Sequence, residues 1–543
     1  MATAIPAMDA EVIDPKRDRL VITASALGTV FEWYDFFVYG TLAALLGNLF
    51  FPSDNPAAAL LKSLAAFGVG FGVRPLGAVV FGYLGDLIGR KYTFLITISV
   101  MGLATAAVGL LPTYAQIGVW APILLLVLRA LQGLALGGEY GGAAIYVAEH
   151  APKGRRGFYT SWIQVSVVGG FLLSLAVVLS TTALIGRESF EAWGWRVPFL
   201  ISLLLLALSL YIRLKLKESP IFRQMKETGT TSKNPLKESF STWDNVRRVF
   251  VALFGISAGL TVIWYTAQFS TLYFLQQTTR LEPMSAQLLI GLASLVSAPA
   301  FVFFGWLSDK VGRKPPMVIG YSLTLLLLFP LFHMIADAGN PALATAMARA
   351  PVTIENADCG YNPFAEKGQA TTCGKVLDYF AKQGISYTKH GGEGPVAVTI
   401  GQQRIEGLQP EAFAAALQAA GYPGAINPTK GVWEVNSDPA QRAEWRIVLA
   451  VVILGILSGM TYGPVAAILV ELFPARIRYT SLSIPYHIGT GYFGGFLPFV
   501  SQYIVVKSGN VFGGLWYTFA VVAVALVVTL FMLPETKDRD IRE

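Results

Sequence analysis

A ten-residue pattern that occurs twice constrains the fold of this chain more than any other feature. The two copies lie 223 residues apart (309 − 86), and each follows a long apolar run and ends in a short basic turn. A mostly apolar chain built from two similar halves is typical of membrane transporters. The first copy contains Gly82, Asp86, Gly89, Arg90 and Lys91, and the second contains Gly305, Asp309, Gly312, Arg313 and Lys314.

A second repeat locates an insertion. It has an offset of 322 residues (462 − 140), which exceeds the first offset by 99 (322 − 223). The second half therefore carries 99 additional residues between Lys314 and Tyr462. The repeated residues are Tyr140-Gly141, Glu149 and Pro152 in the first half, and Tyr462-Gly463, Glu471 and Pro474 in the second.

The composition indicates a membrane protein. Of the 543 residues, 54% are hydrophobic and 14% are charged, whereas a soluble chain carries about a quarter charged residues. A helix needs about 20 apolar residues to span a bilayer. We therefore predict an all-α membrane protein with twelve transmembrane helices in two pseudo-symmetric six-helix halves. The expected spans are 20–47, 59–85, 92–112, 119–148, 157–184, 194–215, 247–277, 284–308, 316–337, 446–471, 478–506 and 510–533.

The distribution of Lys and Arg predicts the orientation. Basic residues gather before the first span, in alternate loops and after the last span, which is the pattern of cytoplasmic segments. Both termini are therefore expected in the cytoplasm. The net charge of +7 reflects these loops, and we expect no nucleic-acid partner. The predicted segments are cytoplasmic tails at 1–19 and 534–543, a first half at 20–216, a cytoplasmic linker at 217–246, and a second half at 247–337 and 445–533.

The insertion, at 338–444, then falls on the extracytoplasmic side and is polar enough to be a small α+β module. We expect helices at 375–383 and 410–420 and strands at 386–389 and 396–400. The only two cysteines, Cys359 and Cys373, both lie here, which favours a disulfide on an oxidising side. Two unpaired thiols are the alternative. The spacing fits no metal site.

The chain resembles the major facilitator superfamily, and within it the metabolite–proton symporter family of proline/betaine, shikimate, α-ketoglutarate and citrate permeases. The resemblance covers almost all of the chain outside the insertion. The motifs that carry it are the repeated loop pattern, Phe31-Glu32-Trp33-Tyr34-Asp35-Phe36, Arg74-Pro75-Leu76-Gly77, Arg129-Ala130-Leu131-Gln132-Gly133, Gly137-Gly138-Glu139-Tyr140-Gly141, Glu218-Ser219-Pro220-Ile221-Phe222 and Pro534-Glu535-Thr536.

The resemblance implies a charge latch that stabilises the outward-facing state. A plain cytoplasmic loop with positive-inside charge is the alternative explanation of the same residues. The expected latch residues are Asp86, Arg90, Lys91 and Glu149 in the first half, and Asp309, Arg313, Lys314 and Glu471 in the second.

Several charged residues lie deep in the predicted spans. A rise of 1.5 Å per residue places Arg74 about 18 Å, Glu32 about 20 Å and Glu139 about 15 Å from the cytoplasmic end. Charges at such depth are costly unless they pair or line a watery cavity, so each is a functional candidate. Arg74 is suited to binding a substrate carboxylate bidentately. Mutual neutralisation of Arg74 and Glu139 is equally compatible with the sequence.

Proton coupling is assigned to a second group. Glu32 and Asp35 are three residues apart on one helix face, where two carboxylates do not ionise together cheaply. Arg129 and Gln132 match a motif that the family links to proton movement. The second half offers aromatic and amide groups, and His487 is either a titrating group or a packing residue. The expected substrate-binding residues are Arg74, Glu139, Tyr140, Tyr34, Trp264, Tyr265, Gln268, Tyr486 and His487.

We therefore predict a proton-coupled symporter of the bacterial inner membrane that imports a small organic acid or zwitterion by alternating access. It is not expected to be an enzyme, to hold a cofactor or a metal, or to form oligomers. Three alternatives remain: an exporter of the same fold, a uniporter, and a non-transporting receptor that senses through the insertion. The fifth span has Gly169-Gly170 without a proline, which weighs against export.

Overall fold

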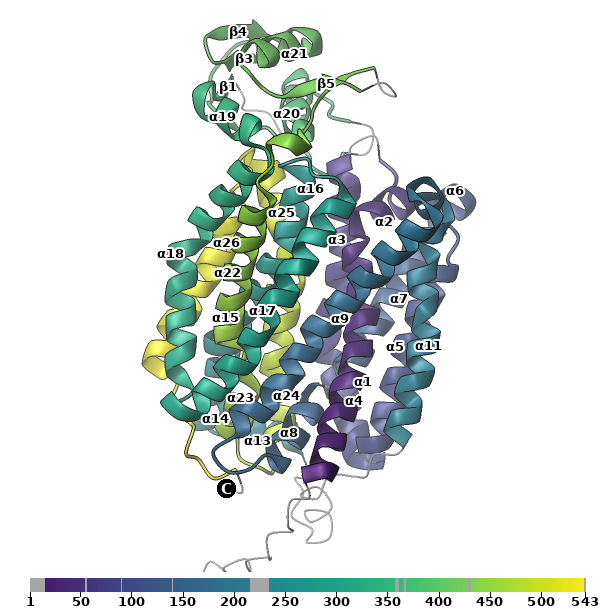
Figure 1. The fold of residues 1–543 in the computed structure, drawn as a ribbon, viewed down its shortest axis with the longest axis vertical. Helices are drawn as coiled ribbons and strands as arrows, with labels where there is room; N and C mark the ends of the chain where they lie inside the picture. Colours follow the sequence, from purple (N-terminus) through teal and green to yellow (C-terminus); the bar gives the residue numbers. More distant parts are fainter. Residues whose placement is uncertain are drawn as a thin grey trace, which may run out of the picture.

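The protein forms one elongated helix bundle with a small mixed module at one end (Figure 1). We name these the module end and the opposite end, and the C-terminus lies at the opposite end. The computed structural model describes residues 15–53, 56–88, 90–138, 140–214, 234–356, 361–365, 368–427 and 431–541, without the side chains of 15–27, 56–57, 82–94, 150 and 212–213.

The first half consists entirely of helices. A π-helical turn, η1, bends the chain by 64° before the last of them. The elements are α1 (Pro15–Thr41), α2 (Ala43–Phe50), α3 (Pro56–Gly72), α4 (Arg74–Ile88), α5 (Arg90–Leu110), α6 (Tyr114–Ile117), α7 (Trp120–Leu136), α8 (Tyr140–His150), α9 (Arg156–Ile185), α10 (Arg187–Ser189), η1 (Phe190–Gly194) and α11 (Arg196–Leu214).

The second half is also helical and is interrupted by the module between α18 and α22. Three π-helical segments, η2, η3 and η5, occur within its long helices. The elements are α13 (Pro235–Ser239), α14 (Trp243–Phe250), η2 (Val251–Ser257), α15 (Ala258–Tyr265), η3 (Thr266–Ser270), α16 (Thr271–Gln277), α17 (Pro283–Val311), α18 (Lys314–Gly339), α22 (Glu444–Tyr462), α23 (Val465–Leu472), α24 (Arg478–Ile488), η5 (Gly489–Gly495), α25 (Leu497–Ser508) and α26 (Leu515–Met532).

Within the described residues, eight helices are long and apolar enough to cross a membrane, or nine if the bent pair at 187–211 counts as one span. Four predicted spans fall outside the eight: 20–47, 92–112, 194–215 and 478–506. The structure is helical there, but the apolar helix at 95–110 is short, the pair at 187–211 is bent, and η5 lies between α24 and α25 in the stretch 478–506. The mostly helical fold is confirmed, and the count of twelve spans stays a prediction.

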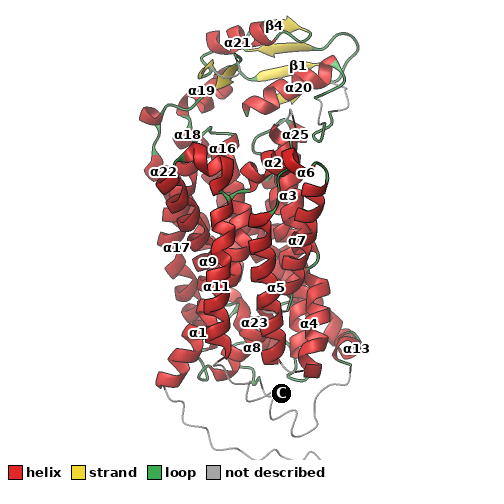
Figure 2. Ribbon diagram, turned by 90° about the vertical axis from the view of Figure 1, so that its right-hand side faces the viewer, coloured by secondary structure: helices red, strands yellow, loops and turns green. Residues whose placement is uncertain are grey.

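The module contains both helices and strands, as expected from the sequence (Figure 2). Its four-stranded sheet has the order β2-β1-β3-β4, with β1 parallel to β2 and the other pairs antiparallel. Strands β5 and β6 form a separate antiparallel pair. The elements are α19 (Pro341–Arg349), β1 (Val352–Glu355), α20 (Thr372–Gln383), β2 (Tyr387–Lys389), β3 (Ala397–Ile400), β4 (Gln403–Glu406), α21 (Pro410–Ala419), β5 (Gly424–Ile426), β6 (Trp433–Val435) and η4 (Pro439–Gln441).

Local sequence explains the two longer module helices. The Thr371 side chain accepts a hydrogen bond from the Gly374 N–H at the start of α20, and Gly384 ends that helix at a φ of 67°. Pro410 occupies the first turn of α21, where its missing N–H costs nothing. The predicted helices and strands of the module are confirmed, whereas β1, β4, β5, β6 and α19 were not predicted. These strands are only three or four residues long, and the pairing partners of β1 are distant in sequence.

The two halves contact each other through long helices. Helix α9 of the first half lies against α17 of the second, and α4 and α8 lie against α24. Gly157 and Gly305 form the closest part of the α9–α17 contact. A Cβ atom on Gly157 would lie 2.3 Å from the Gly305 carbonyl oxygen, so neither position has space for a side chain.

Candidate functional site

Arg74 lies at the centre of the interface between the halves. It begins α4, its side chain is fully buried, and its guanidinium lies 5.4 Å from the Trp33 ring and 5.3 Å from the Phe71 ring. One guanidinium nitrogen donates to the Thr490 hydroxyl at 3.4 Å. Its Nε and Nη2 have no hydrogen-bond partner among the described residues. Buried donors of this kind are costly unless a ligand takes them up.

Aromatic side chains from both halves extend the site from Arg74. Phe71 meets the Tyr265 ring at 5.4 Å, and Tyr265 meets Trp264 at 5.0 Å. Trp264 stacks on Phe37 of α1 at 5.0 Å. Within the described residues, the Tyr265 hydroxyl and the Trp264 indole N–H also lack a partner. These two predicted residues therefore continue the aromatic group that begins at Phe71, and each carries an unused buried donor.

A stacked tyrosine pair closes the other side of the site. The Tyr140 and Tyr486 rings, from α8 and α24, are 3.7 Å apart and nearly parallel at 4°. Gln164 of α9 donates to the Tyr140 hydroxyl at 2.8 Å. The neighbouring residue His487 is fully buried, and neither of its ring nitrogens has a partner in the described part of the chain. A packing histidine normally forms at least one hydrogen bond, so the unused nitrogens favour a functional role for His487.

Two of the predicted substrate-binding residues are engaged elsewhere. The Tyr34 hydroxyl donates to the Pro198 carbonyl of α11, within the first half. The Gln268 carbonyl oxygen accepts a hydrogen bond from Ser294 of α17 at 2.7 Å. Glu139 lies outside the described residues. The structure therefore places six of the nine predicted residues in one group that extends from Arg74 through ring contacts and charge interactions: Arg74, Tyr140, Trp264, Tyr265, Tyr486 and His487.

The residues predicted to couple protons form two groups. Glu32 and Asp35 are buried on α1, on either side of Trp33 in the sequence. Arg129 is buried within the first half, where it donates to Gln132 at 2.7 Å and lies 4.3 Å from the Phe36 ring. The Gln132 amide donates in turn to the Thr105 hydroxyl at 2.7 Å. Arg129 and Gln132 therefore form a connected network beside α1.

The second copy of the repeated loop forms a buried ionic cluster at the opposite end. Arg313 lies 2.6 Å from Asp309 and 2.9 Å from Glu471, and it is almost completely buried. The Asp309 carboxylate also accepts the backbone N–H groups of Gly157 and Phe158, both at 2.8 Å. Asp309 therefore binds the N-terminus of α9, where the helix dipole favours a negative charge. Three of the predicted latch residues, Asp309, Arg313 and Glu471, thus lie together, and Asp309 joins the two halves.

Ion pairs between the halves extend the cluster. Arg156 lies 3.6 Å from Glu471, and Arg478 lies 3.8 Å from Glu149. Neither arginine was predicted as a latch residue. The two are nevertheless equivalent positions of the second repeat, because they are separated by its offset of 322 residues (478 − 156). The predicted latch residues Asp86, Arg90 and Lys91 have side chains outside the described set.

The C-terminal segment also contacts the second loop. Glu535 accepts the backbone N–H groups of Arg313 and Lys314 at 2.8 and 3.2 Å, and Thr536 donates to Glu471 at 2.8 Å. The Lys314 ammonium donates to the Leu530 carbonyl. Lys314 therefore anchors α26 instead of joining the carboxylates. The Pro534-Glu535-Thr536 motif marked this contact in the sequence, but its partner was not predicted.

The halves also meet towards the module end. Tyr273 of α16 donates to the Gly40 carbonyl at 2.8 Å, and Gln287 of α17 donates to the Thr41 carbonyl at 3.4 Å. The Phe269 ring packs so closely on Gly40 that a Cβ there would lie 2.6 Å away. Contacts between the halves therefore lie at both ends, with the Arg74 site between them.

π-Helical turns border the site. Segment η3 directly follows Tyr265, and η5 contains Thr490, which contacts Arg74. A Cβ on Gly495 of η5 would lie 2.1 Å from the Phe71 ring, so the two halves approach closely there. Such turns occur often at functional sites because they break regular backbone bonding. Hydrophobic periodicity does not reveal them, and they were not predicted.

Several known proteins are similar to this chain. A family model described as "Sugar (and other) transporter" matches residues 20–254. The chain is 40% identical over 329 residues to the shikimate transporter of Escherichia coli strain K12, covering 60% of this chain and 74% of that relative. It is 31% identical over 465 residues to the proline/betaine transporter of the same strain, covering 83% and 85%. Alignments with two other relatives cover 66% and 67% of the relatives' lengths.

The fold is similar to that of a crystallised D-xylose–proton symporter. The TM-score is 0.60 at 17% sequence identity, and the match covers 96% of this chain and 99% of the other. At this identity the likeness concerns the fold alone.

Proposed function

This chain belongs to the metabolite–proton symporter family of the major facilitator superfamily, and we propose that it imports a small polar metabolite together with protons. Members of this family are membrane transporters and not enzymes. The relatives named for proline, betaine and shikimate carry carboxylates or zwitterions, which is the substrate class we assign to this chain. A bacterial inner membrane is the location that fits these relatives.

The buried guanidinium of Arg74 carries the proposal. Its charge lies between the two halves, and Nε and Nη2 are unused among the described residues. A carboxylate accepts two parallel hydrogen bonds from such a fork. The Trp33 and Phe71 rings beside it suit a cationic or apolar portion of the same molecule. An organic acid or a zwitterion therefore satisfies the site in a way that a neutral sugar does not.

Glu32 and Asp35 are the proposed proton carriers. Both are buried on α1, the helix that also supplies Trp33 to the Arg74 site. A carboxylate in such surroundings changes its protonation when a neighbouring charge arrives or leaves. We assign a supporting role to the network of Arg129 and Gln132. Glu139 is proposed to face Arg74 at one stage of the cycle.

Alternating access is proposed to work by breaking one set of contacts between the halves at a time. The ion pairs around Glu149, Asp309, Arg313 and Glu471 support a latch at the opposite end. The latch is proposed to include Asp86, Arg90 and Lys91 of the first loop. The contacts of Tyr273 and Gln287 would form the gate at the module end.

The topology proposed from the sequence is retained. It has twelve spans, both termini in the cytoplasm, the module at 338–444 in the periplasm, and a monomeric transporter. The module and the C-terminus lie at opposite ends of the bundle, which supports this orientation (Figure 1). We also retain the disulfide between Cys359 and Cys373. Cys359 lies outside the described residues, and no described cysteine is a free thiol.

Uptake by the purified full-length protein in proteoliposomes tests the function. We expect accumulation of at least one of L-proline, glycine betaine and shikimate when the external pH is lower than the internal pH. A protonophore should abolish accumulation above equilibrium. Facilitated uptake that is unchanged by the protonophore would establish the uniporter instead. The absence of transport of every compound in a wider panel of organic acids and zwitterions would contradict the proposal.

A further inference from the structure

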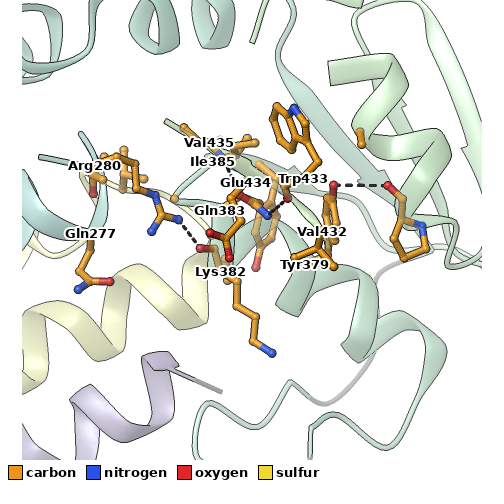
Figure 3. A pocket seen from close by; sticks show the side chains of 18 of the residues that line it. Gln277, Arg280, Tyr379, Lys382, Gln383, Ile385, Val432, Trp433, Glu434 and Val435 are labelled. Atoms are coloured by element: carbon orange, nitrogen blue, oxygen red, sulfur yellow. Dashed lines mark hydrogen bonds between the residues drawn. The ribbon is translucent and has the colours of Figure 1, made fainter. Parts of the chain in front are cut away.

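A cavity lies where the module meets the bundle, and Arg74 is not among the residues that line it (Figure 3). Its volume is about 1030 Å³. The bundle contributes walls from both halves, with Leu60 and Leu61 from α3 and Val506 from α25. The module contributes α20, α21 and β6. The cavity is thus bounded by three separate parts of the structure.

The module is fixed in place on this side by direct hydrogen bonds and close packing. Arg280, in the turn between α16 and α17, donates to the Lys382 carbonyl at the end of α20. Tyr387 donates its backbone N–H to the Gly509 carbonyl at 2.9 Å. A Cβ on Gly384 would lie 2.6 Å from the Gln277 carbonyl oxygen. These contacts make the cavity a defined feature of the fold.

Three residues that line the cavity carry buried donors that are unused in the described structure. The Arg280 Nε, the Tyr387 hydroxyl and the Trp433 indole N–H all lack a hydrogen-bond partner among the described residues. Only 5% of Tyr387 is exposed. Native proteins seldom leave such groups unsatisfied, because each one costs free energy. Three of them on residues of one cavity indicate a ligand that accepts hydrogen bonds.

The charges of the wall include both signs. Burial lowers the pKa of Arg280, and the negative charge of Glu434 opposes that shift. Figure 3 shows both side chains at the cavity. Glu434 also accepts a hydrogen bond from the Asn427 amide at 2.8 Å. A simple anion would meet Glu434 as well as Arg280, so a ligand with charges of both signs fits better.

The remaining walls combine apolar and aromatic side chains with further polar ones, among them Gln277, Lys382 and Glu411. Leu60, Leu61, Ile385 and Val506 line the bundle side and the end of α20, and the Tyr379 and Trp433 side chains line the module side. Such a surface suits an apolar body with polar groups at one end.

We infer that this cavity binds a small zwitterion with an apolar side chain, of the amino-acid type. Its carboxylate would accept from Arg280 and Tyr387, and its ammonium group would lie at Glu434. The site is separate from the transport site at Arg74 and shares no residue with it. Leu60 and Leu61 belong to the first half and Val506 belongs to the second. The bound ligand would therefore contact both halves and the module at once.

Equilibrium binding of L-phenylalanine to the full-length protein in nanodiscs tests the inference. Two matched compounds serve as controls: phenylalaninamide lacks the carboxylate, and 3-phenylpropanoate lacks the ammonium group. We expect saturable binding of L-phenylalanine and binding about tenfold weaker for each analogue. Absence of saturable binding up to about 10 mM would overturn the inference.

Variants separate this cavity from the transport site. Arg280→Gln, Glu434→Gln and Tyr387→Phe should each weaken binding about tenfold. Arg74→Ala should leave it unchanged. Tyr422→Phe is the matched control, since this buried module tyrosine donates to the Ala350 carbonyl at 2.8 Å and does not line the cavity.

Thermal unfolding of each variant identifies any that has lost its fold. Tyr387→Phe is the most informative, because the hydroxyl it removes has no partner to lose. Binding that disappears in Arg74→Ala, or that stays unchanged in both Glu434→Gln and Tyr387→Phe, would overturn the inference. A failure of transport by the wild-type protein would leave this result unaffected, since the binding measurement does not involve transport.

Discussion

The Arg156 guanidinium of the first half lies 3.6 Å from the Glu471 carboxylate of the second. The equivalent residues pair in the reverse direction, with Arg478 of the second half 3.8 Å from Glu149 of the first. Each half thus supplies one cation and one anion to the other. All four side chains are largely buried, so the pairs are poorly screened by solvent. This reciprocal exchange ties the halves together at the end opposite the module.

Asp309→Asn should weaken the contact between the halves at this end. It removes the charge that pairs with Arg313 and that accepts two N–H groups of α9. Breaking a buried pair on one side costs about 3 kcal/mol. The measurement is the rate of maleimide labelling at Ser161→Cys, which is buried between α9 and α17, in a background without the two native cysteines. We expect labelling to be at least about tenfold faster.

The control for this experiment is Asp244→Asn, which breaks an exposed pair with Arg248 in α14. A surface pair of this kind contributes about 0–1 kcal/mol. Equal labelling rates in Asp309→Asn and the wild-type protein would show that the cluster does not hold the halves together.

Gly157→Ala should force the same interface apart by steric overlap. Its new methyl group would lie 2.3 Å from the Gly305 carbonyl oxygen, and backbone atoms cannot move aside cheaply. Overpacking of this kind costs about 1–3 kcal/mol. The expected result is a lower midpoint of thermal unfolding. Gly291→Ala on α17 is the control, because its methyl group would meet only Leu175 at 3.4 Å, and a midpoint equally lowered there would contradict the argument.

Arg74→Ala should abolish transport without reducing stability. Arg74 forms only one long hydrogen bond, at 3.4 Å, and its other buried donors are unused among the described residues. Removing an incompletely paired buried charge is often neutral or stabilising. We expect uptake to fall at least about a hundredfold, which corresponds to about 3 kcal/mol of lost substrate interaction, with an unchanged or higher unfolding midpoint.

Arg129→Ala is the contrasting variant. Arg129 donates to Gln132 and to the Phe67 carbonyl, so its removal leaves buried groups unpaired and should lower the midpoint. If Arg74→Ala unfolds as readily as Arg129→Ala, then Arg74 is a structural residue.

Glu535→Gln should change how the thermal stability of the protein depends on pH at acidic pH. Burial alone would raise the pKa of Glu535, but backbone N–H groups of Arg313, Lys537, Lys314 and Thr536 outweigh it and hold the pKa below its usual 4.5. A carboxylate with a lowered folded pKa stabilises the protein above its unfolded pKa, and this contribution is lost as the pH falls through the folded value.

The check is thermal unfolding of the wild-type protein and Glu535→Gln between about pH 3 and about pH 7. The variant should be less stable than the wild-type protein near neutral pH, and the difference should shrink below about pH 4. Glu188→Gln, at an exposed position of α10, provides the control. A difference between the wild-type protein and Glu535→Gln that stays constant across the pH range would contradict the assignment.

The repeats and the composition determined the broad plan of this protein. A chain with long apolar runs and few charges has to place its helices in lipid, and two motifs at separate offsets require two similar halves with an insertion in the second. Residue chemistry alone also made Arg74 a functional candidate, because a charge at that depth is costly without a function. The pattern of residues also predicted the two longer helices of the module, at 375–383 and 410–420.

Tertiary structure decided which side chains meet. Sequence symmetry relates Tyr140 to Tyr462, but Tyr140 stacks on Tyr486, because the partner depends on how α8 and α24 pack. The same packing directs Tyr34 to Pro198 and brings the three parts of the structure together around Arg280. Such contacts join residues that are far apart in the chain, and their geometry depends on the positions of whole helices. Local sequence specifies the helices but does not fix how they are arranged.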